Sequence, residues 1–291
     1  MAVVTGASRG LGFEIALALA KAGDDVILAA RDPERGRLAA EKIAAQVQTD
    51  VSFRRLDLSD LASVAEFAEE MASRSAVDLL INNAGVMALP TRKETGEGFE
   101  MQFGTNYLGH FALTMRLLPL LARGRASRVV NLSSLAHRTG SIDFDDLQAA
   151  RSYSPWKAYG QSKLAMLMFA IELQRRSEAR NWRLLSVAAH PGWARTELFA
   201  NGPGGLFSLA ADLAVPWFGQ SAADGAMPPL FAATSPSAKS GGYYGPGGIG
   251  ELRGPPSPAI VGPQARQPSI CARLWEVSQT LTRASVEKDA D

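Results

Sequence analysis

The sequence predicts an α/β fold in which helices cover both faces of a doubly wound sheet of about seven parallel strands. Short aliphatic runs alternate with helix-length segments over residues 2–189. The runs are apolar throughout, as expected of strands that are buried on both faces. A glycine-rich turn, TGASRGLG (5–12), follows the first run. These three observations indicate βαβ units and therefore a parallel sheet.

Each element follows from its own residues. The predicted strands are AVVT (2–5), DVILAA (25–30), VSFRRL (51–56), VDLLI (77–81), RVVNL (128–132) and LLSVAA (184–189), with a seventh near GGYYG (241–245). The helix after the second strand has Asp32 in the N-cap position and Pro33 at its first helical position. The helix after the third strand, SDLASVAEFAEEMAS (59–73), has Ser59 in the cap position.

Composition limits the classes of function. The 291 residues, 46% apolar and 20% charged, are typical of a globular protein with one large domain or two small ones, and we expect a single domain over 1–291. The net charge of +1 provides no basic surface for nucleic acid. Cys271 is the single cysteine, which fits a reducing compartment, and the absence of CxxC and HExxH predicts no metal site. We expect a cytoplasmic protein, because MAVVTGAS starts a strand without a signal sequence and no 18-residue apolar run predicts a transmembrane helix.

The composition changes near Asn201. Between Asn201 and Pro268 lie 11 of the 16 prolines and 13 of the 27 glycines. The segment GGLFSLAADLAVPWFG (204–219) within this region is almost entirely apolar. We interpret 197–240 as a region that covers the substrate, with 204–219 as its flap. A plain buried or partner-facing helix is the alternative.

The glycine-rich turn has the features of a dinucleotide site. Gly6 permits a tight turn, Gly10 lets a pyrophosphate approach the backbone, and Gly12 allows close packing of helix on strand. Free N–H groups at the start of the helix then face the phosphates. The spacing GxxxGxG departs from the GxGxxG fingerprint, so the turn gains its weight from its position at the first βα junction.

The end of the second strand indicates which cofactor is bound. Dinucleotide sites usually have an acidic residue about 20 positions after the turn, on the ribose 2′-hydroxyl. Here the strand ends in Ala29 and Ala30, and Arg31 follows. A guanidinium can bind a 2′-phosphate, and Arg9 offers a second cation, whereas Asp32 is explained by its cap role. The sequence favours NADP(H) over NAD(H), with a solvated loop charge as the other interpretation of Arg31.

Polar residues at later strand ends predict the site of chemistry. NNAG (82–85) closes the fourth strand and RVVNLSS (128–134) ends the fifth, and both ends face the same crevice as the glycine turn. On the following helix Tyr159 and Lys163 are four residues apart and share one face. A cation beside a phenol lowers its pKa. The pair therefore predicts an acid–base group, although an isolated YxxxK also occurs on ordinary surface helices.

Together these segments closely resemble the short-chain dehydrogenase/reductase family of the classical type, which implies a Rossmann-type fold. The motifs that carry the resemblance keep the family's order: TGASRGLG (5–12), Asp57–Leu58, NNAG (82–85), Asn106 within TNYLG (105–109), the serines, YGQSK (159–163) and HPGWART (190–196). SSLAH (133–137) is similar to the same segment in retinol-dehydrogenase-like and carbonyl-reductase-like members.

The resemblance implies a role for each matching residue. Tyr159 is the expected general acid for carbonyl reduction and base for oxidation, while Lys163 lowers its pKa and holds the nicotinamide ribose. Ser134 is expected to donate to the substrate oxygen, and Asn106 to anchor a water that relays protons to Lys163. The expected cofactor contacts are Gly6, Ser8, Arg9, Gly10, Leu11, Gly12, Arg31, Asp57, Leu58, Asn83, Ala84, Gly85, Tyr159, Lys163, Pro191, Gly192 and Thr196.

The serine pair and its surroundings require a choice. Family members usually use the second serine of such a pair, so Ser134 is expected to act on the substrate and Ser133 to bond the backbone. Ser134 and Tyr159 are further apart than is usual, which predicts an insertion over 135–156. His190 is expected to shape a turn beside the cofactor rather than to take part in the chemistry.

We therefore expect an NADP(H)-dependent enzyme that interconverts a carbonyl and an alcohol. The Pro/Gly-rich apolar region predicts a bulky, largely apolar small-molecule substrate. A C=C reductase with the same Tyr/Lys pair and a non-catalytic NADPH-binding regulator are the alternatives. The apolar stretch MLMFAIEL (166–173) could pair two copies, whereas the insertion could cover it, so both a monomer and a homodimer stay open.

Overall fold

The computed structural model describes residues 1–193 and 220–284. Within them the chain forms a sheet of eight strands in the order β3-β2-β1-β4-β5-β6-β7-β8. The strands are β1 (Ala2–Thr5), β2 (Val26–Ala30), β3 (Val51–Arg55), β4 (Leu79–Asn82), β5 (Arg128–Leu132), β6 (Leu185–Ala189), β7 (Tyr243–Pro246) and β8 (Pro256–Pro258). The predicted α/β fold with a parallel sheet is confirmed: the strands β1 to β7 all pair in parallel.

The eighth strand is an addition that the sequence pattern does not indicate. β8 pairs antiparallel with β7 at the edge of the sheet. Two of its three residues are prolines, which cannot donate to the ladder and are confined to edges and strand ends. Such a segment has no apolar run from which a strand could be predicted.

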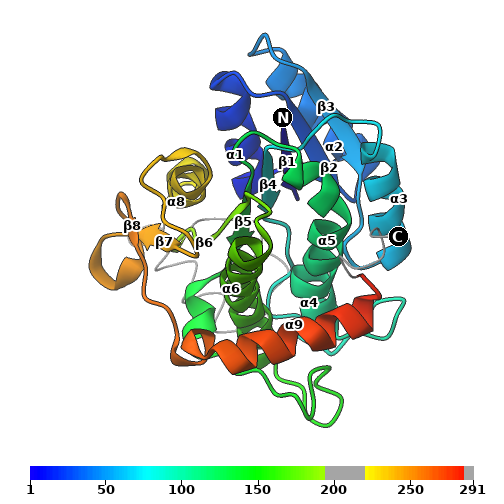
Figure 1. The fold of residues 1–291 in the computed structure, drawn as a ribbon, viewed down its shortest axis with the longest axis vertical. Coiled ribbons are helices and arrows are strands. Elements are labelled where there is room, and N and C mark those ends of the chain that lie inside the picture. The colour runs from blue at the N-terminus through cyan, green and yellow to red at the C-terminus, as the bar shows by residue number, and fades with distance from the viewer. Residues whose placement is uncertain (194–219, 285–291) are drawn as a thin grey trace.

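Helices cover both faces of the sheet (Figure 1). They are α1 (Gly10–Lys21), α2 (Pro33–Ala44), α3 (Leu61–Met71), α4 (Met101–Phe103), α5 (Gly109–Ala122), α6 (Pro155–Arg180), α8 (Ala222–Thr234) and α9 (Pro268–Thr282). One apolar core lies between the sheet and α1, α2 and α8, and a second lies between the sheet and α3, α5 and α6. Burial on both sides explains why the inner strands β1, β2 and β4 are apolar, whereas the edge strand β3 (VSFRR) is half-buried and carries two arginines.

Two helix starts test the predicted caps. Asp32 caps α2 by accepting from Arg35 N at 3.1 Å, and Pro33 is the first residue of that helix, as predicted. The cap of α3 is Asp60 and not Ser59, so the prediction of Ser59 is wrong. The Ser59 hydroxyl donates instead to Asp57 at 2.6 Å, while the Asp60 carboxylate accepts from the first free amides of the helix.

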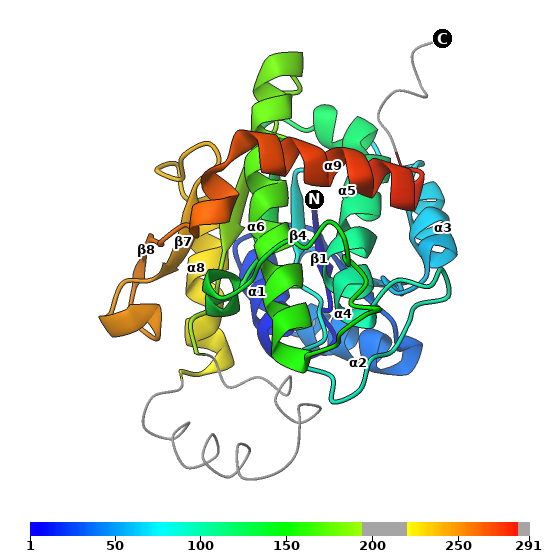
Figure 2. The same cartoon turned by 90° about the horizontal axis from the view of Figure 1, so that it is seen from below.

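The C-terminal helix α9 lies across α5 and α6 (Figures 1 and 2). The Trp275 ring on α9 is 5.0 Å from the Phe111 ring and 5.7 Å from the Phe169 ring, measured between centroids. The Arg176 guanidinium lies 4.6 Å from the centroid of the Trp275 ring. The face of α6 that carries Phe169 is therefore covered by the chain's own C-terminal helix rather than by the insertion.

The structure describes all of the predicted insertion, 135–156, but only part of the predicted substrate-covering region, 197–240. Residues 135–156 begin with a 3-10 turn, η2 (Leu135–Arg138), and continue as a loop to the start of α6. Of 197–240, the described residues contribute α8, which packs beside α1 on the sheet. The flap predicted at 204–219 lies outside the described residues. No helix in the described ranges is long and apolar enough to span a membrane.

The strand order places a crevice at one edge of the sheet. Between β1 and β4 the order reverses, and ligands of open α/β sheets bind outside the carboxyl ends of the strands at such a point. β1 ends at Thr5 and β4 at Asn82. The glycine-rich turn and NNAG therefore meet at this edge.

Candidate active site

A cavity of about 330 Å³ lies at this switch point. It contains these predicted cofactor contacts: Gly6, Ser8, Arg9, Gly10, Leu11, Gly12, Arg31, Asp57, Leu58, Asn83, Ala84, Gly85, Tyr159, Lys163 and Pro191. Gly192 does not line it, and Thr196 lies outside the described residues. Its further lining residues, which were not among the predicted cofactor contacts, are Thr5, Ala29, Ala30, Asp32, Arg35, Leu56, Val86, Thr105, Leu132 and Ser133.

A larger hollow of about 520 Å³ lies along β3 and α2, lined by Arg37 and Phe53 among others. It includes neither the glycine-rich turn nor the Tyr/Lys pair. The smaller cavity is therefore the candidate site, because it alone of the two joins these groups.

The glycine-rich turn brings the backbone close to the cavity. Gly6 has φ +66°, a left-handed conformation that glycine adopts without strain. A Cβ at Gly12 would lie 2.5 Å from the Gly6 carbonyl oxygen and 2.5 Å from Asn83 Nδ2. Gly12 thus permits the close packing that the sequence predicts. No described side chain caps α1, and its first turn has no acidic residue, so its amide groups suit an anion.

Arginine side chains gather where β2 ends. Arg9, Arg31 and Arg35 all line the cavity, and Arg35 was not identified from the sequence. The Asp32 carboxylate accepts from Arg35 N and forms an ion pair of 3.5 Å with the Arg35 side chain. The Asp32 carboxylate therefore caps the start of α2, as predicted. This end of the cavity is cationic.

The end of β4 is held to β1 through Thr5. The Thr5 hydroxyl accepts from Asn83 N at 2.9 Å and from Ala84 N at 3.0 Å. The Asn83 side chain returns a hydrogen bond to the Thr5 carbonyl at 2.7 Å. His110 Nε2 lies 2.9 Å from the same hydroxyl. The sequence shows no sign of this network, because its members lie far apart along the chain.

Asn106 lies in a π-helical turn, η1 (Gly104–Leu108), and its side chain is fully engaged. Its Oδ1 accepts from Val86 N at 2.7 Å, and Nδ2 donates to the Val86 carbonyl and to Ser162 Oγ, both at 2.9 Å. Its main-chain carbonyl is 2.8 Å from His110 Nδ1. That carbonyl accepts, so Nδ1 carries the proton of the His110 ring. The Asn106 side chain therefore ties η1 to the segment after β4 and to α6.

The two serines have different partners. Ser133 Oγ donates to the Lys163 carbonyl at 2.8 Å, so this hydroxyl bonds the backbone. The Ser134 hydroxyl accepts from Ala136 N at 3.3 Å and is near enough to Tyr159 to lower the pKa of its phenol. Lys163 Nζ donates to the Leu132 carbonyl at 3.0 Å and lies 5.8 Å from the centroid of the Tyr159 ring. Tyr159 and Lys163 therefore line one end of the cavity, and Ser134 lies beside Tyr159 without lining the cavity itself.

Comparison with known proteins agrees with this geometry. The family model described as short chain dehydrogenase matches residues 1–203. The chain belongs to the short-chain dehydrogenase family. It is therefore an NAD(P)-dependent oxidoreductase of alcohols and carbonyls.

Several relatives of this short-chain dehydrogenase can be named. Polyprenol dehydrogenase of Mus musculus is 40% identical over 98% of this chain and 84% of its own length. Retinol dehydrogenase 11 of Homo sapiens is 40% identical over 96% of this chain and 84% of its own length. The similarity to retinol-dehydrogenase-like members is confirmed.

Solved structures share the fold. A crystal structure of an uncharacterized protein from Mycobacterium paratuberculosis has 40% identity and a TM-score of 0.80, covering 98% of this chain and 94% of that one. The RhlG/NADP active-site complex of Pseudomonas aeruginosa has 27% identity and a TM-score of 0.65, covering 83% and 92%. The second of these structures contains NADP.

Burial controls the protonation of the Tyr/Lys pair in this dehydrogenase. It raises the pKa of Tyr159 to about 12, and the hydrogen bond with Ser134 acts in the opposite direction. Burial also lowers the pKa of Lys163 to about 8. Burial is the largest influence on the pKa of Tyr159 in this structure, and the lowering of that pKa by the Lys163 charge stays a prediction.

Apolar residues form a wall that packs against Tyr159. Met87, Ala88 and Tyr159 form a small buried cluster against which Ala136 packs. The Trp156 ring stands nearly perpendicular to the Tyr159 ring at 6.0 Å, and Trp156 is 42% exposed. This wall thus consists of buried residues and one exposed aromatic ring, that of Trp156.

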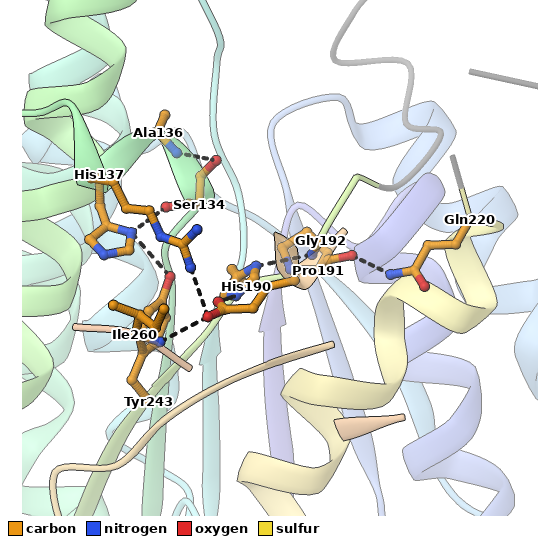
Figure 3. A network of polar contacts seen from close by, with 11 residues as sticks. Ser134, Ala136, His137, His190, Pro191, Gly192, Gln220, Tyr243 and Ile260 are labelled. Carbon is orange, nitrogen blue, oxygen red and sulfur yellow. Dashed lines mark hydrogen bonds and ion pairs between the residues drawn. The ribbon is translucent and has the colours of Figure 1, made fainter. Parts of the chain in front are cut away.

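His190 shapes the turn that carries Pro191 (Figure 3). Gly192 N donates to His190 Nδ1 at 3.1 Å. Pro191 lines the cavity, and its carbonyl accepts from the Gln220 side chain. The turn-forming role predicted for His190 agrees with this geometry.

Proposed function

We propose that this short-chain dehydrogenase uses NADP(H) to interconvert a carbonyl and an alcohol on a bulky, largely apolar substrate. The observation that carries the proposal is a cavity with Tyr159 and Lys163 at one end, Ser134 beside Tyr159, and three arginines at the other end. A dinucleotide with a 2′-phosphate fits this distribution of charge. The NADP complex of the Pseudomonas relative supports the same cofactor.

The residues at the chemical end have distinct tasks. When bound, the cofactor supplies the hydride. Tyr159 donates the proton to the carbonyl oxygen, and its raised pKa keeps the phenol protonated at neutral pH, which suits reduction. Ser134 donates a hydrogen bond to the same oxygen and stabilises its developing charge. Lys163 holds the nicotinamide ribose.

The proton relay through Asn106 stays a prediction. The amide of Asn106 is occupied by Val86 and Ser162, so a water that reaches Lys163 would have to bind its main-chain carbonyl. That carbonyl already accepts from His110 Nδ1 at 2.8 Å.

The substrate class follows from the wall beside Tyr159. Met87, Ala88, Ala136 and Trp156 surround Tyr159 with uncharged, apolar side chains, and Trp156 among them is 42% exposed. Polyprenol and retinol, after which two relatives are named, are apolar alcohols, which supports the same class. The flap predicted at 204–219 would complete this wall.

We also propose a monomer in a reducing compartment such as the cytoplasm. The pairing surface considered for 166–173 is occupied by α9, with Met166, Leu167 and Met168 fully buried in a single chain. The free, buried Cys271 fits a reducing environment. A single domain over 1–291 accords with one continuous sheet.

The test is the oxidation of NADPH and of NADH in the presence of bulky aromatic and aliphatic aldehydes and ketones. Turnover with NADPH and little with NADH is expected. Consumption of enones but not of isolated ketones would favour a C=C reductase. NADPH binding without turnover of any carbonyl would favour the regulator.

The cationic end is tested by Arg31→Ala. We expect KM for NADPH to rise about tenfold, because a charge-assisted hydrogen bond to phosphate is lost, and KM for NADH to stay unchanged. Arg37→Ala, further along α2 and outside the cavity, is the matched control. Equal effects of Arg31→Ala on both cofactors would contradict a phosphate-binding role.

A further inference from the structure

We propose that Glu251 is a positioning residue for this reaction: its carboxylate joins the segment that carries Ser134 to the turn that carries Pro191. The inference rests on the proposed function, because it gives Glu251 a part in that reaction. Neither sequence motif nor cavity lining points to this residue. It lies in η4 (Ile249–Glu251), on the connection between β7 and β8.

Three donors converge on the Glu251 carboxylate, and two of them, His190 and Ile260, are labelled in Figure 3. Its Oε1 is 2.7 Å from the Arg138 guanidinium and accepts from Ile260 N at 3.1 Å. Its Oε2 is 2.9 Å from His190 Nε2. The side chain is 13% exposed, so water competes little for these oxygens. The two oxygens thus connect Glu251 to two different segments: Oε2 to the turn after β6 through His190, and Oε1 to η2 through Arg138. We call these connections the first and the second arm.

The backbone of Glu251 adopts a strained conformation, which indicates that its surroundings hold the residue in place. Its φ is +57°, a left-handed conformation that is unfavourable for a residue with a Cβ. Such strain persists only where the surroundings hold the residue, and it clusters at functional sites. The contacts of the carboxylate are the interactions that hold it.

The first arm runs through His190 to the cofactor end of the cavity. Gly192 N donates to Nδ1 of His190, so Nδ1 is the acceptor and the ring proton resides on Nε2. Nε2 therefore donates to Glu251. Burial lowers the pKa of His190 to about 4, which keeps this neutral tautomer at neutral pH. The ring is fixed at both nitrogens, and with it the turn that places Pro191 in the cavity.

The second arm runs through Arg138 to the substrate end. Arg138 is the last residue of η2, and Ser134 caps the first turn by accepting from Ala136 N at 3.3 Å. The Ser134 carbonyl is also held by His137, whose Nδ1 lies at 2.7 Å and whose main-chain N lies at 3.0 Å. The pair of Arg138 with Glu251 anchors the far end of this short turn. It thereby fixes the hydroxyl that meets Tyr159.

Only a carboxylate satisfies this arrangement. An amide has one acceptor oxygen, so in Glu251→Gln an NH₂ group must face either the His190 donor or the Arg138 and Ile260 donors. The same substitution leaves the Arg138 charge without its 2.7 Å partner. Both arms therefore depend on the second oxygen and on the charge.

The experiment uses the purified full chain and separates the arms. We measure kcat and KM with the best carbonyl of the panel, Kd for NADPH by fluorescence titration, and Tm. Glu251→Gln should lower kcat about tenfold and weaken NADPH binding, since small displacements of positioned groups cost rate. Arg138→Gln should lower kcat and leave Kd for NADPH within about twofold. His190→Asn should weaken NADPH binding with a smaller effect on kcat.

The matched control is Glu172→Gln. Glu172 is a buried carboxylate that accepts from Arg175 and Arg176 beneath α9, away from the cavity. Its loss should lower Tm and leave kcat and Kd unchanged. Restored kcat in Glu251→Asp, which keeps both oxygens, would add support.

Two outcomes would overturn the inference. One is a kcat within about twofold of wild type for folded Glu251→Gln and Arg138→Gln. The other is a fall of kcat that merely follows Tm in all variants, Glu172→Gln included. If the wild-type chain reduces no carbonyl, the proposed function fails instead, and the NADPH titrations of Glu251→Gln and His190→Asn still test the first arm.

Discussion

Gly12→Ala tests how closely the glycine-rich turn is packed. The new Cβ would lie 2.5 Å from the Gly6 oxygen and 2.5 Å from Asn83 Nδ2, against 3.4 Å for the start of ordinary contact. Each contact is 0.9 Å too short (3.4 minus 2.5). The Gly6 oxygen belongs to the backbone, and Asn83 Nδ2 is held by its 2.7 Å hydrogen bond to Thr5. Neither neighbour can move without displacing the other walls of the site.

The expected cost follows from this overlap. Overpacking of this kind destabilises a fold by about 1–3 kcal/mol. The displaced atoms form the turn that faces the phosphates, so NADPH affinity should fall at least about tenfold, which corresponds to about 1.4 kcal/mol. Fluorescence titration gives Kd, and urea unfolding gives the stability.

The control for Gly12→Ala is Gly96→Ala. A Cβ at Gly96 meets nothing within 4 Å, so both measurements should match wild type. A folded Gly12→Ala protein with Kd for NADPH within about twofold of wild type would refute the packing argument.

Two further predictions concern stability. Burial lowers the pKa of Lys163 from 10.5 to about 8, so the unfolded chain binds this proton more tightly and the free energy of unfolding should rise between these pH values. Urea unfolding of cofactor-free protein should show this rise in wild type and lose it in Lys163→Met; equal slopes would contradict the burial effect. Trp275→Ala should cost about 3–5 kcal/mol in urea unfolding, because a fully packed indole is removed from between Phe111 and Phe169. A loss below about 1 kcal/mol would show that α9 is not firmly docked.

Much of the fold follows from the sequence because strand burial has a local signature. Six aliphatic runs lie within two residues of the strands observed. The glycine-rich turn and the Tyr/Lys pair are likewise local patterns, so they identify both ends of the cavity. β8 could not be predicted, because its two prolines leave no strand pattern. Asp60 rather than Ser59 caps α3, because the Ser59 hydroxyl donates to Asp57.

The parts that could not be predicted depend on contacts between distant segments. Thr5 and His110 are 105 residues apart, and Glu251 is 61 residues from His190. The cover over α6 comes from α9, whose apolar residues do not reveal the surface against which they pack. The pKa of Tyr159 depends on burial, which the four-residue spacing to Lys163 does not report.

The central claim is that Tyr159 delivers the proton, and Tyr159→Phe tests it directly. With Tyr107→Phe as the control, a buried tyrosine whose hydroxyl bonds Ser278, we would compare kcat for NADPH-dependent reduction of the best carbonyl. We expect Tyr159→Phe to lose about 100-fold or more in kcat while Kd for NADPH barely changes, and Tyr107→Phe to keep its kcat. Turnover of Tyr159→Phe close to that of wild type would contradict the mechanism.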